Sequence, residues 1–190
     1  MGGGYNTDKD RFLAVLKINF LMFIGELIIG LYSGSWAMLS DSFHLFLDTL
    51  APLISYIPEL HIPGISKNRV KKISVQISIS LFFIVAGVIV YEAVARISNP
   101  PELRIDFWFF LVATLGLIGN IYSFLILKRR GDENCSVLRK LLSRHMLVDA
   151  GGSVVVIFGA IGVLVWKINI LDPILSIILA ILIMIAPFID

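Results

Sequence analysis

Six long apolar stretches constrain what this chain of 190 residues can fold into. A helix needs roughly 20 apolar residues to cross the hydrocarbon core of a bilayer, and each stretch is close to that length. Inside lipid a helix satisfies its backbone polar groups by its own hydrogen bonds, so continuous apolar runs of this length favour helices. We therefore predict an all-α integral membrane protein, a bundle of six transmembrane helices over residues 12–32, 36–57, 73–94, 107–127, 141–165 and 170–189.

The composition supports the same class. Hydrophobic residues make up 57% of the chain and the mean hydropathy is +0.89, which excludes an ordinary soluble domain. The connections between the stretches are short, so residues 1–190 are predicted to form a single transmembrane domain without a C-terminal cytosolic domain. The first eleven residues show no cleavage pattern of a signal peptide. The single Cys135 excludes a disulfide framework within one chain and a multi-cysteine metal site.

Basic residues predict how the bundle is oriented in the membrane. They gather before the first stretch, between the second and third, and between the fourth and fifth. The connections on the other side hold only Arg96 at an edge, Arg104 and Lys167. By the positive-inside rule the N-terminus and both basic connections face the cytosol, and an even number of spans returns the C-terminus to that side. The basic residues are Lys9, Arg11, Lys67, Arg69, Lys71, Lys72, Lys128, Arg129, Arg130, Arg139 and Lys140.

Two pairs of histidine and aspartate interrupt the second and fifth stretches. His44 and Asp48 are four residues apart, and His145 and Asp149 repeat that spacing. Residues four apart lie on the same face of a helix, one above the other. Two such helices offer two imidazoles and two carboxylates, a ligand set that suits a tetrahedral zinc site.

Two interpretations of these pairs compete. A carboxylate at mid-membrane costs roughly 2.5–3.5 kcal/mol on insertion scales, so each aspartate needs a compensating partner. In the first interpretation the pairs hydrogen-bond to each other and only fasten two helices. In the second, His44, Asp48, His145 and Asp149 bind a divalent cation whose charge the two aspartates balance, and two matching pairs on helices of opposite direction favour it. Asp41, one turn before His44, is either a helix cap or a residue that attracts cations.

Three further polar residues have structural interpretations. Glu26 lies between Gly25 and Gly30 in the first stretch, and these two glycines give a small-residue surface that favours close helix packing. His61 lies near the predicted cytosolic mouth, where an interfacial histidine is the simpler interpretation and a ligand for incoming cations is the alternative. Asn120, within the fourth stretch, is a polar group that needs a partner inside the bundle.

Helix ends account for most of the remaining charged residues. Asp106 precedes the fourth stretch and is predicted to cap it, and Asp172, followed by a proline, is predicted to cap the sixth. Glu92 and Arg96 are four residues apart at the end of the third stretch, and we predict a helix-stabilising ion pair there.

Several of these motifs resemble the cation diffusion facilitator family of zinc transporters, and the resemblance covers nearly the whole chain. The most specific motif is LSDSFHLFLD at residues 39–48, which is similar to the family's second helix, particularly in its eukaryotic secretory-pathway members. The spacing of His145 and Asp149 is similar to the fifth-helix half of the family's metal site. Weaker similarities are GSWA at 34–37, EAVAR at 92–96 and DPILS at 172–176. The resemblance implies six helices, a tetrahedral zinc site near the membrane centre, dimers, and exchange of zinc for protons by alternating access.

We therefore expect a secondary active transporter that exports zinc, or cadmium, from the cytosol in exchange for protons. Zinc is expected as the transported substrate, and the chain is expected not to be an enzyme. The expected partners are protons, the lipid bilayer and a second copy in a homodimer, and no nucleic acid. The expected location is the cell (inner) membrane or an organelle membrane, which the chain crosses several times. The alternatives are a non-transporting partner subunit and a membrane-embedded zinc enzyme.

Overall fold

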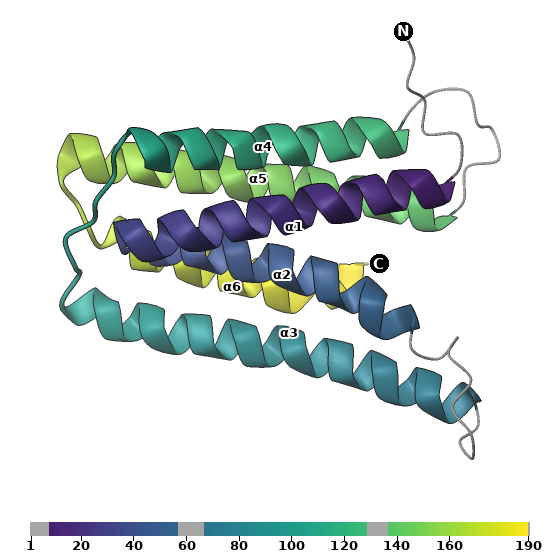
Figure 1. Cartoon of the computed structure of the whole chain (residues 1–190). Coiled ribbons are helices and arrows are strands. Elements are labelled where there is room, and N and C mark those ends of the chain that lie inside the picture. Colours follow the sequence, from purple (N-terminus) through teal and green to yellow (C-terminus); the bar gives the residue numbers. More distant parts are fainter. Residues whose placement is uncertain (1–7, 57–66, 129–136, 190) are drawn as a thin grey trace, which may run out of the picture.

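The computed structural model describes residues 8–56, 67–128 and 137–189. Within these ranges the chain forms six α-helices and no strand, which confirms the predicted all-α class (Figure 1). Each helix overlaps one predicted stretch almost completely; α1, α3 and α5 begin several residues earlier than predicted, and α3 also ends later. The helices are α1 (Asp8–Ser33), α2 (Trp36–Tyr56), α3 (Lys67–Ser98), α4 (Phe107–Lys128), α5 (Val137–Trp166) and α6 (Leu171–Ile189).

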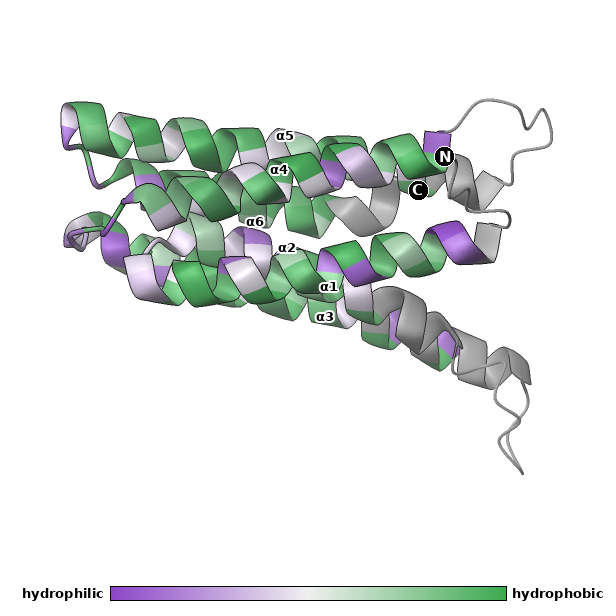
Figure 2. Ribbon diagram, turned by 45° about the horizontal axis from the view of Figure 1, so that its top comes forward, coloured by the Kyte–Doolittle hydropathy of each residue, from purple (hydrophilic) through white to green (hydrophobic). Residues whose placement is uncertain are grey.

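Length and surface character identify the chain as an all-α membrane protein. Large apolar side chains point outward, with Leu21 70% and Phe158 68% exposed. Apolar residues predominate along the helices (Figure 2). A surface of this kind requires lipid around it. Within α6, the segment Leu171–Ile185 is a shorter apolar helix. The number of spans and the side of the membrane on which the termini lie therefore stay predictions. Four segments are long and apolar enough to cross a membrane, Asp10–Ser33, Val75–Ser98, Phe107–Lys128 and Leu142–Trp166.

The helices run up and down, and their connections define two ends of the bundle. The turn end carries the connections at residues 34–35, 99–106 and 167–170, and the opposite end carries both ends of the described chain (Figure 1). α1 packs against α2 and α4, and α4 packs against α5. α3 packs against α6 and α2. α2 therefore lies between α1 on one side and the α3–α6 pair on the other.

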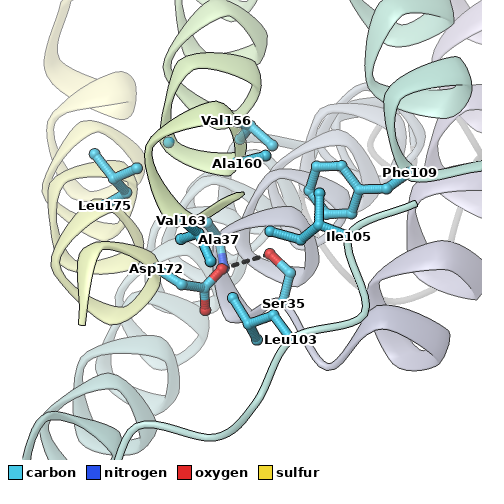
Figure 3. A pocket seen from close by; sticks show the side chains of 11 residues that line it. Ser35, Ala37, Leu103, Ile105, Phe109, Val156, Ala160, Val163, Asp172 and Leu175 are labelled. Atoms are coloured by element: carbon cyan, nitrogen blue, oxygen red, sulfur yellow. Dashed lines mark hydrogen bonds between the residues drawn. The ribbon is translucent and has the colours of Figure 1, made fainter. Parts of the chain in front are cut away.

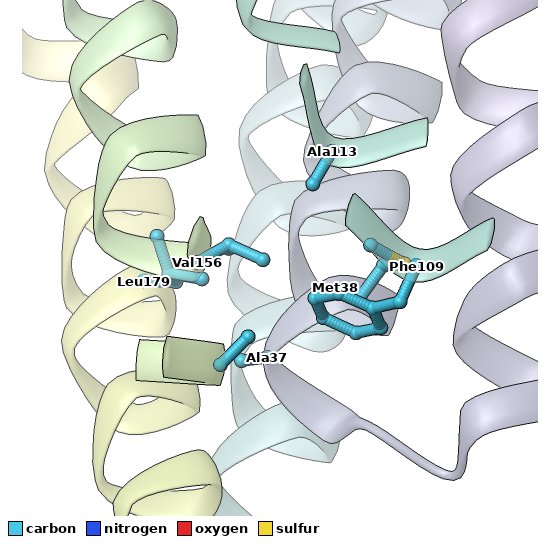
Figure 4. Packing of buried hydrophobic residues seen from close by; sticks show 7 residues of the cluster. Ala37, Met38, Phe109, Ala113, Val156 and Leu179 are labelled. Carbon is cyan, nitrogen blue, oxygen red and sulfur yellow. The ribbon is translucent and has the colours of Figure 1, made fainter. Parts of the chain in front are cut away.

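Three apolar clusters hold the helices together. One joins α2, α3 and α6, and another joins α1, α4 and α5 toward the opposite end. Close packing of α1 on α2, expected from the small residues of α1, is also present, because a Cβ added at Gly30 would lie only 2.8 Å from Leu39 Cδ2. The third cluster, here the turn-end cluster, joins α2, α4, α5 and α6 (Figure 4) and consists of Ala37, Met38, Phe109, Ala113, Val156, Ala160 and Leu179.

Helix ends at the turn end confirm one predicted cap and correct another. Asp106 Oδ1 accepts hydrogen bonds from the backbone N–H groups of Trp108 and Phe109 at 3.0 and 3.2 Å, so it caps α4 as predicted. Asp172 lies inside the first turn of α6. Its carboxylate accepts hydrogen bonds from the N–H groups of Trp36 and Ala37, at the start of α2, so the prediction that it caps α6 was wrong. The free N–H groups of a second helix compete for this carboxylate, and local sequence does not show them.

Arg96 is also engaged differently from the prediction. Its Nη1 donates a hydrogen bond to the Gly34 carbonyl at 2.8 Å, and its guanidinium lies 4.8 Å from the centre of the Trp36 ring. The predicted ion pair with Glu92 is therefore replaced by contacts that tie the end of α3 to the turn between α1 and α2.

Candidate metal centre

The four residues predicted to bind a metal meet where α2 faces α5. His44 and Asp48 lie one turn apart on α2, and His145 and Asp149 lie one turn apart on α5. One possible ligand atom from each of the four lies within 4.8 Å of the other three. Because α2 and α5 run in opposite directions, the histidine of each helix faces the aspartate of the other.

The distances show this crosswise pairing. His44 Nε2 lies 3.1 Å from Asp149 Oδ1, and His145 Nε2 lies 3.0 Å from Asp48 Oδ1. Within one helix the distances are longer, at 3.7 Å between His44 Nε2 and Asp48 Oδ2 and 3.9 Å between His145 Nε2 and Asp149 Oδ2. Zinc binds such atoms at about 2.0–2.2 Å, which sets neighbouring corners of a tetrahedron roughly 3.3 Å apart. The two crosswise pairs are therefore close to this spacing, and the four ligand atoms, all within 4.8 Å of one another, would have to draw somewhat closer together to surround a tetrahedral zinc ion.

Burial and unpaired atoms also suit a cation. The side chain of His145 is 20% exposed and that of Asp149 is 1% exposed, so the site is shielded on most sides. Among the four site residues, three buried atoms have no hydrogen-bond partner in the described part of the chain, namely His44 Nδ1, Asp48 Oδ2 and Asp149 Oδ2. An unsatisfied buried polar group costs about 1–3 kcal/mol. A cation bound between the two carboxylates would remove that cost for both of their oxygens.

Asp41 belongs to a second group of buried polar side chains, one turn from the site toward the turn end. Asp41 is 6% exposed and its carboxylate lies beside the Ser153 hydroxyl. Because α2 begins at Trp36, Asp41 lies in the second turn, and the interpretation of Asp41 as the helix cap was wrong. Ser35 has that role, since its Oγ accepts a hydrogen bond from the Met38 N–H at 3.2 Å.

Two other buried polar residues adjoin this group. Asn120 finds the partner that the sequence required, because its Nδ2 donates to Ser153 Oγ at 3.3 Å. Glu26 is 2% exposed, its Oε1 fills the space beside Gly116, and its Oε2 has no hydrogen-bond partner in the described ranges. Helix packing alone is thus an incomplete account of Glu26. Ser153 was not predicted, and its spacing of four residues from Asp149 was the signal that could have indicated it.

Some residues singled out from the sequence lie outside the described ranges. These include His61, the candidate ligand for incoming cations, and Cys135. Arg129 and Arg130, two of the basic residues that predict the orientation, lie outside as well. The predicted orientation in the membrane therefore still rests on the sequence.

Comparison with known proteins supplies a family and several relatives. The family model for the cation efflux transmembrane domain matches residues 12–62 and 65–188. A Bacillus subtilis (strain 168) protein described as a cadmium, cobalt and zinc/H(+)-K(+) antiporter is 28% identical over 192 residues, covering 95% of this chain and 61% of its own length. The zinc transporter ZitB of Yersinia pseudotuberculosis is 28% identical over 187 residues, covering 94% of this chain and 59% of its own.

A third relative is more similar over a shorter range. The metal cation efflux system protein CzcD of Cupriavidus metallidurans is 32% identical over 173 residues, which cover 85% of this chain and 54% of that protein. This chain thus spans between about half and three fifths of the length of these curated relatives.

Proposed function

This chain belongs to the cation efflux transmembrane domain family, and from that premise we propose that it is a secondary active transporter that exports zinc from the cytosol in exchange for protons. In this proposal His44, Asp48, His145 and Asp149 bind zinc as the transported substrate. Cadmium is the second candidate substrate, because the Bacillus subtilis relative is named for cadmium, cobalt and zinc.

The observation that carries the proposal is the crosswise meeting of the two pairs between α2 and α5. Two imidazole nitrogens and two carboxylate oxygens lie within 4.8 Å of one another. Imidazole suits zinc, whereas magnesium, calcium and manganese favour all-oxygen sites. The two carboxylates also balance the double charge of the ion, so the loaded site is neutral inside the membrane.

The competing interpretation, in which the pairs only fasten helices, explains less of the geometry. Fastening α2 to α5 requires one histidine–aspartate hydrogen bond, and the site contains two of them. It also leaves Asp48 Oδ2 and Asp149 Oδ2 buried without a partner in the described part of the chain. A cation would use both oxygens, and this difference favours binding.

Proton exchange follows from the chemistry of the ligands. A histidine must lose its proton from the coordinating nitrogen before it binds a metal, so metal binding at such a site releases protons. Protons that enter from the far side would compete with zinc for the same nitrogens and displace it. The name of the Bacillus subtilis relative, which includes exchange with H(+) and K(+), supports a counter-ion of this kind.

Transport requires that the site opens to each side in turn, as helices rock around it. His145 is the more exposed histidine and lies on the side of the site nearer the opposite end. We infer that zinc enters from the opposite end, which faces the cytosol, and leaves at the turn end. Six spans, cytosolic termini, a homodimer, and a location in the cell inner membrane or an organelle membrane complete the proposal.

Two rival functions make different demands on the site. A catalytic zinc usually has three protein ligands and an open position, whereas four side chains converge here. A non-transporting partner subunit needs no complete ligand set. Both rivals predict no metal flux through the purified chain.

A flux experiment tests the proposal. The purified chain is reconstituted in liposomes that contain a zinc dye and a pH dye, and zinc is added outside. We expect zinc to enter, protons to leave, and both signals to vanish in Asp48→Ala. Glu102→Ala, which removes an exposed carboxylate from the α3–α4 connection, is the matched control and should behave as the wild type. Zinc flux at the wild-type rate in Asp48→Ala would contradict the site, and zinc flux without a pH signal would contradict the exchange.

A further inference from the structure

The Asp172 carboxylate ties the start of α2 to α6. It accepts hydrogen bonds from the backbone N–H groups of Trp36 at 2.7 Å and Ala37 at 3.3 Å. It also accepts a hydrogen bond from the Ser35 hydroxyl (Figure 3). Asp172 is only 5% exposed, so these bonds are largely shielded from water. A carboxylate is well suited to this position, because the N-terminus of a helix carries free donors and partial positive charge.

A second set of contacts ties the same point to α3. Arg96 donates from Nη1 to the Gly34 carbonyl at 2.8 Å and stacks on the Trp36 ring. The Trp36 indole Nε1 donates to the Ile89 carbonyl of α3 at 3.1 Å. The start of α2, the helix that carries His44 in its third turn, is therefore held by polar contacts from both helices of the α3–α6 pair.

The turn-end cluster begins at this tie and extends toward the metal centre. Ala37 belongs both to the tie and to the cluster, and Leu179, another member, lines a small pocket together with His44 and Asp149. Four helices contribute to the cluster, and three of its members, Ala37, Ala113 and Ala160, have small side chains. Because these side chains are small, the helices can separate here without any long side chain changing its rotamer. A small pocket beside the Asp172 carboxylate opens onto Ala160 (Figure 3). In this conformation the cluster separates the metal centre from the turn end.

We propose that Asp172 is the tether of an outer gate, in which it holds α2 against α6 and the turn-end cluster seals the route from the metal centre. This inference rests on the proposed transport function and adds a positioning residue that touches no metal ligand. Outward opening then requires release of the tether. When α2 moves away from α6, water replaces the lost partners of the Asp172 carboxylate and of the backbone N–H groups, so the bonds can be exchanged in each cycle.

Thiol labelling tests the gate directly. In a Cys135→Ser background, Ala160→Cys places one reporter behind the tether, and Val15→Cys places another in the buried core near the opposite end. Asp172→Asn keeps the shape of the side chain but removes its charge, and charge-assisted hydrogen bonds are about twice as strong as neutral ones. We expect Asp172→Asn to raise the labelling rate of the Ala160→Cys reporter at least about tenfold, and that of the Val15→Cys reporter not at all.

The controls separate a gate from a merely structural cap. Asp106→Asn weakens another cap at the turn end, that of α4, and should leave both labelling rates unchanged. Ser35→Ala removes one donor to Asp172 and should raise labelling of the Ala160→Cys reporter less than Asp172→Asn does. The zinc affinity of Asp172→Asn, measured by calorimetry, should stay within about threefold of the wild type, because the ligands are unchanged.

The labelling experiment tests the gate, and the flux experiment tests the proposed transport function. An unchanged labelling rate at the Ala160→Cys reporter, or an equal increase at both reporters, would overturn the gate. Labelling is measured without zinc, so it does not depend on transport. Absence of zinc flux in the wild type would overturn the proposed function, whatever the labelling shows.

Discussion

Asp149→Asn is the sharpest test of the metal centre. Asparagine has nearly the shape of aspartate, so the contact at 3.1 Å with His44 can persist as a neutral hydrogen bond. The substitution removes one of the two negative charges that would balance zinc. Because Asp149 is 1% exposed, water cannot easily replace the lost charge.

The expected magnitude follows from this burial. Removing one partner from a buried charge pair typically costs about 3–5 kcal/mol. At about 1.4 kcal/mol per factor of ten, zinc affinity should fall by roughly two to four orders of magnitude. The measurement is calorimetric titration of the purified protein with zinc at fixed pH. Asp106→Asn, an equivalent change at the turn end, is the control and should bind zinc as the wild type does. A zinc affinity of Asp149→Asn within about threefold of the wild type would refute the reasoning.

Three further predictions test metal choice, pH dependence and packing. The double variant His44→Asp with His145→Asp should bind manganese better relative to zinc, in competition titrations, because its site would contain only oxygen ligands. Zinc affinity of the wild type should fall as the pH is lowered from about 7.5 to 5.5, a window around the free histidine pKa of about 6.5, because protonated imidazole cannot bind metal. A zinc affinity that does not change across this window would contradict the prediction. Gly30→Ala should lower stability in thermal unfolding by about 1–3 kcal/mol, because its Cβ would meet Leu39, whereas Gly87→Ala, with open space around it, should not destabilise.

The helices and the site could be predicted from sequence because both depend on local patterns. An apolar run of about 20 residues specifies a membrane helix almost by itself, since the backbone has no alternative partners in lipid. The His44–Asp48 and His145–Asp149 pairs each share a helix face by their spacing. Short connections then force neighbouring helices to alternate in direction, which brings two faces with such pairs into one bundle.

The contacts at the turn end could not be predicted in this way. Asp172 stands before a proline at the start of a helix, where local rules assign it to that helix, yet its partners are about 136 residues away in sequence. Arg96 and Glu92 have the spacing of an ion pair, but the Gly34 carbonyl of the α1–α2 turn and the Trp36 indole ring of α2 lie within reach of the guanidinium. The partner of a charged side chain depends on the distances between helices. The spacing of residues within one helix carries no information about those distances.

The direction of the two site helices explains how a repeated motif becomes a mixed ligand set. Both motifs place histidine four residues before aspartate. On parallel helices in register, imidazole would face imidazole and carboxylate would face carboxylate, and adjacent carboxylates repel each other. α2 and α5 are separated by three reversals of the chain, so they are antiparallel, and each imidazole faces a carboxylate at 3.1 or 3.0 Å. In the proposed transporter, the same four side chains would hold one another by hydrogen bonds while the site is empty and would surround a cation when one binds.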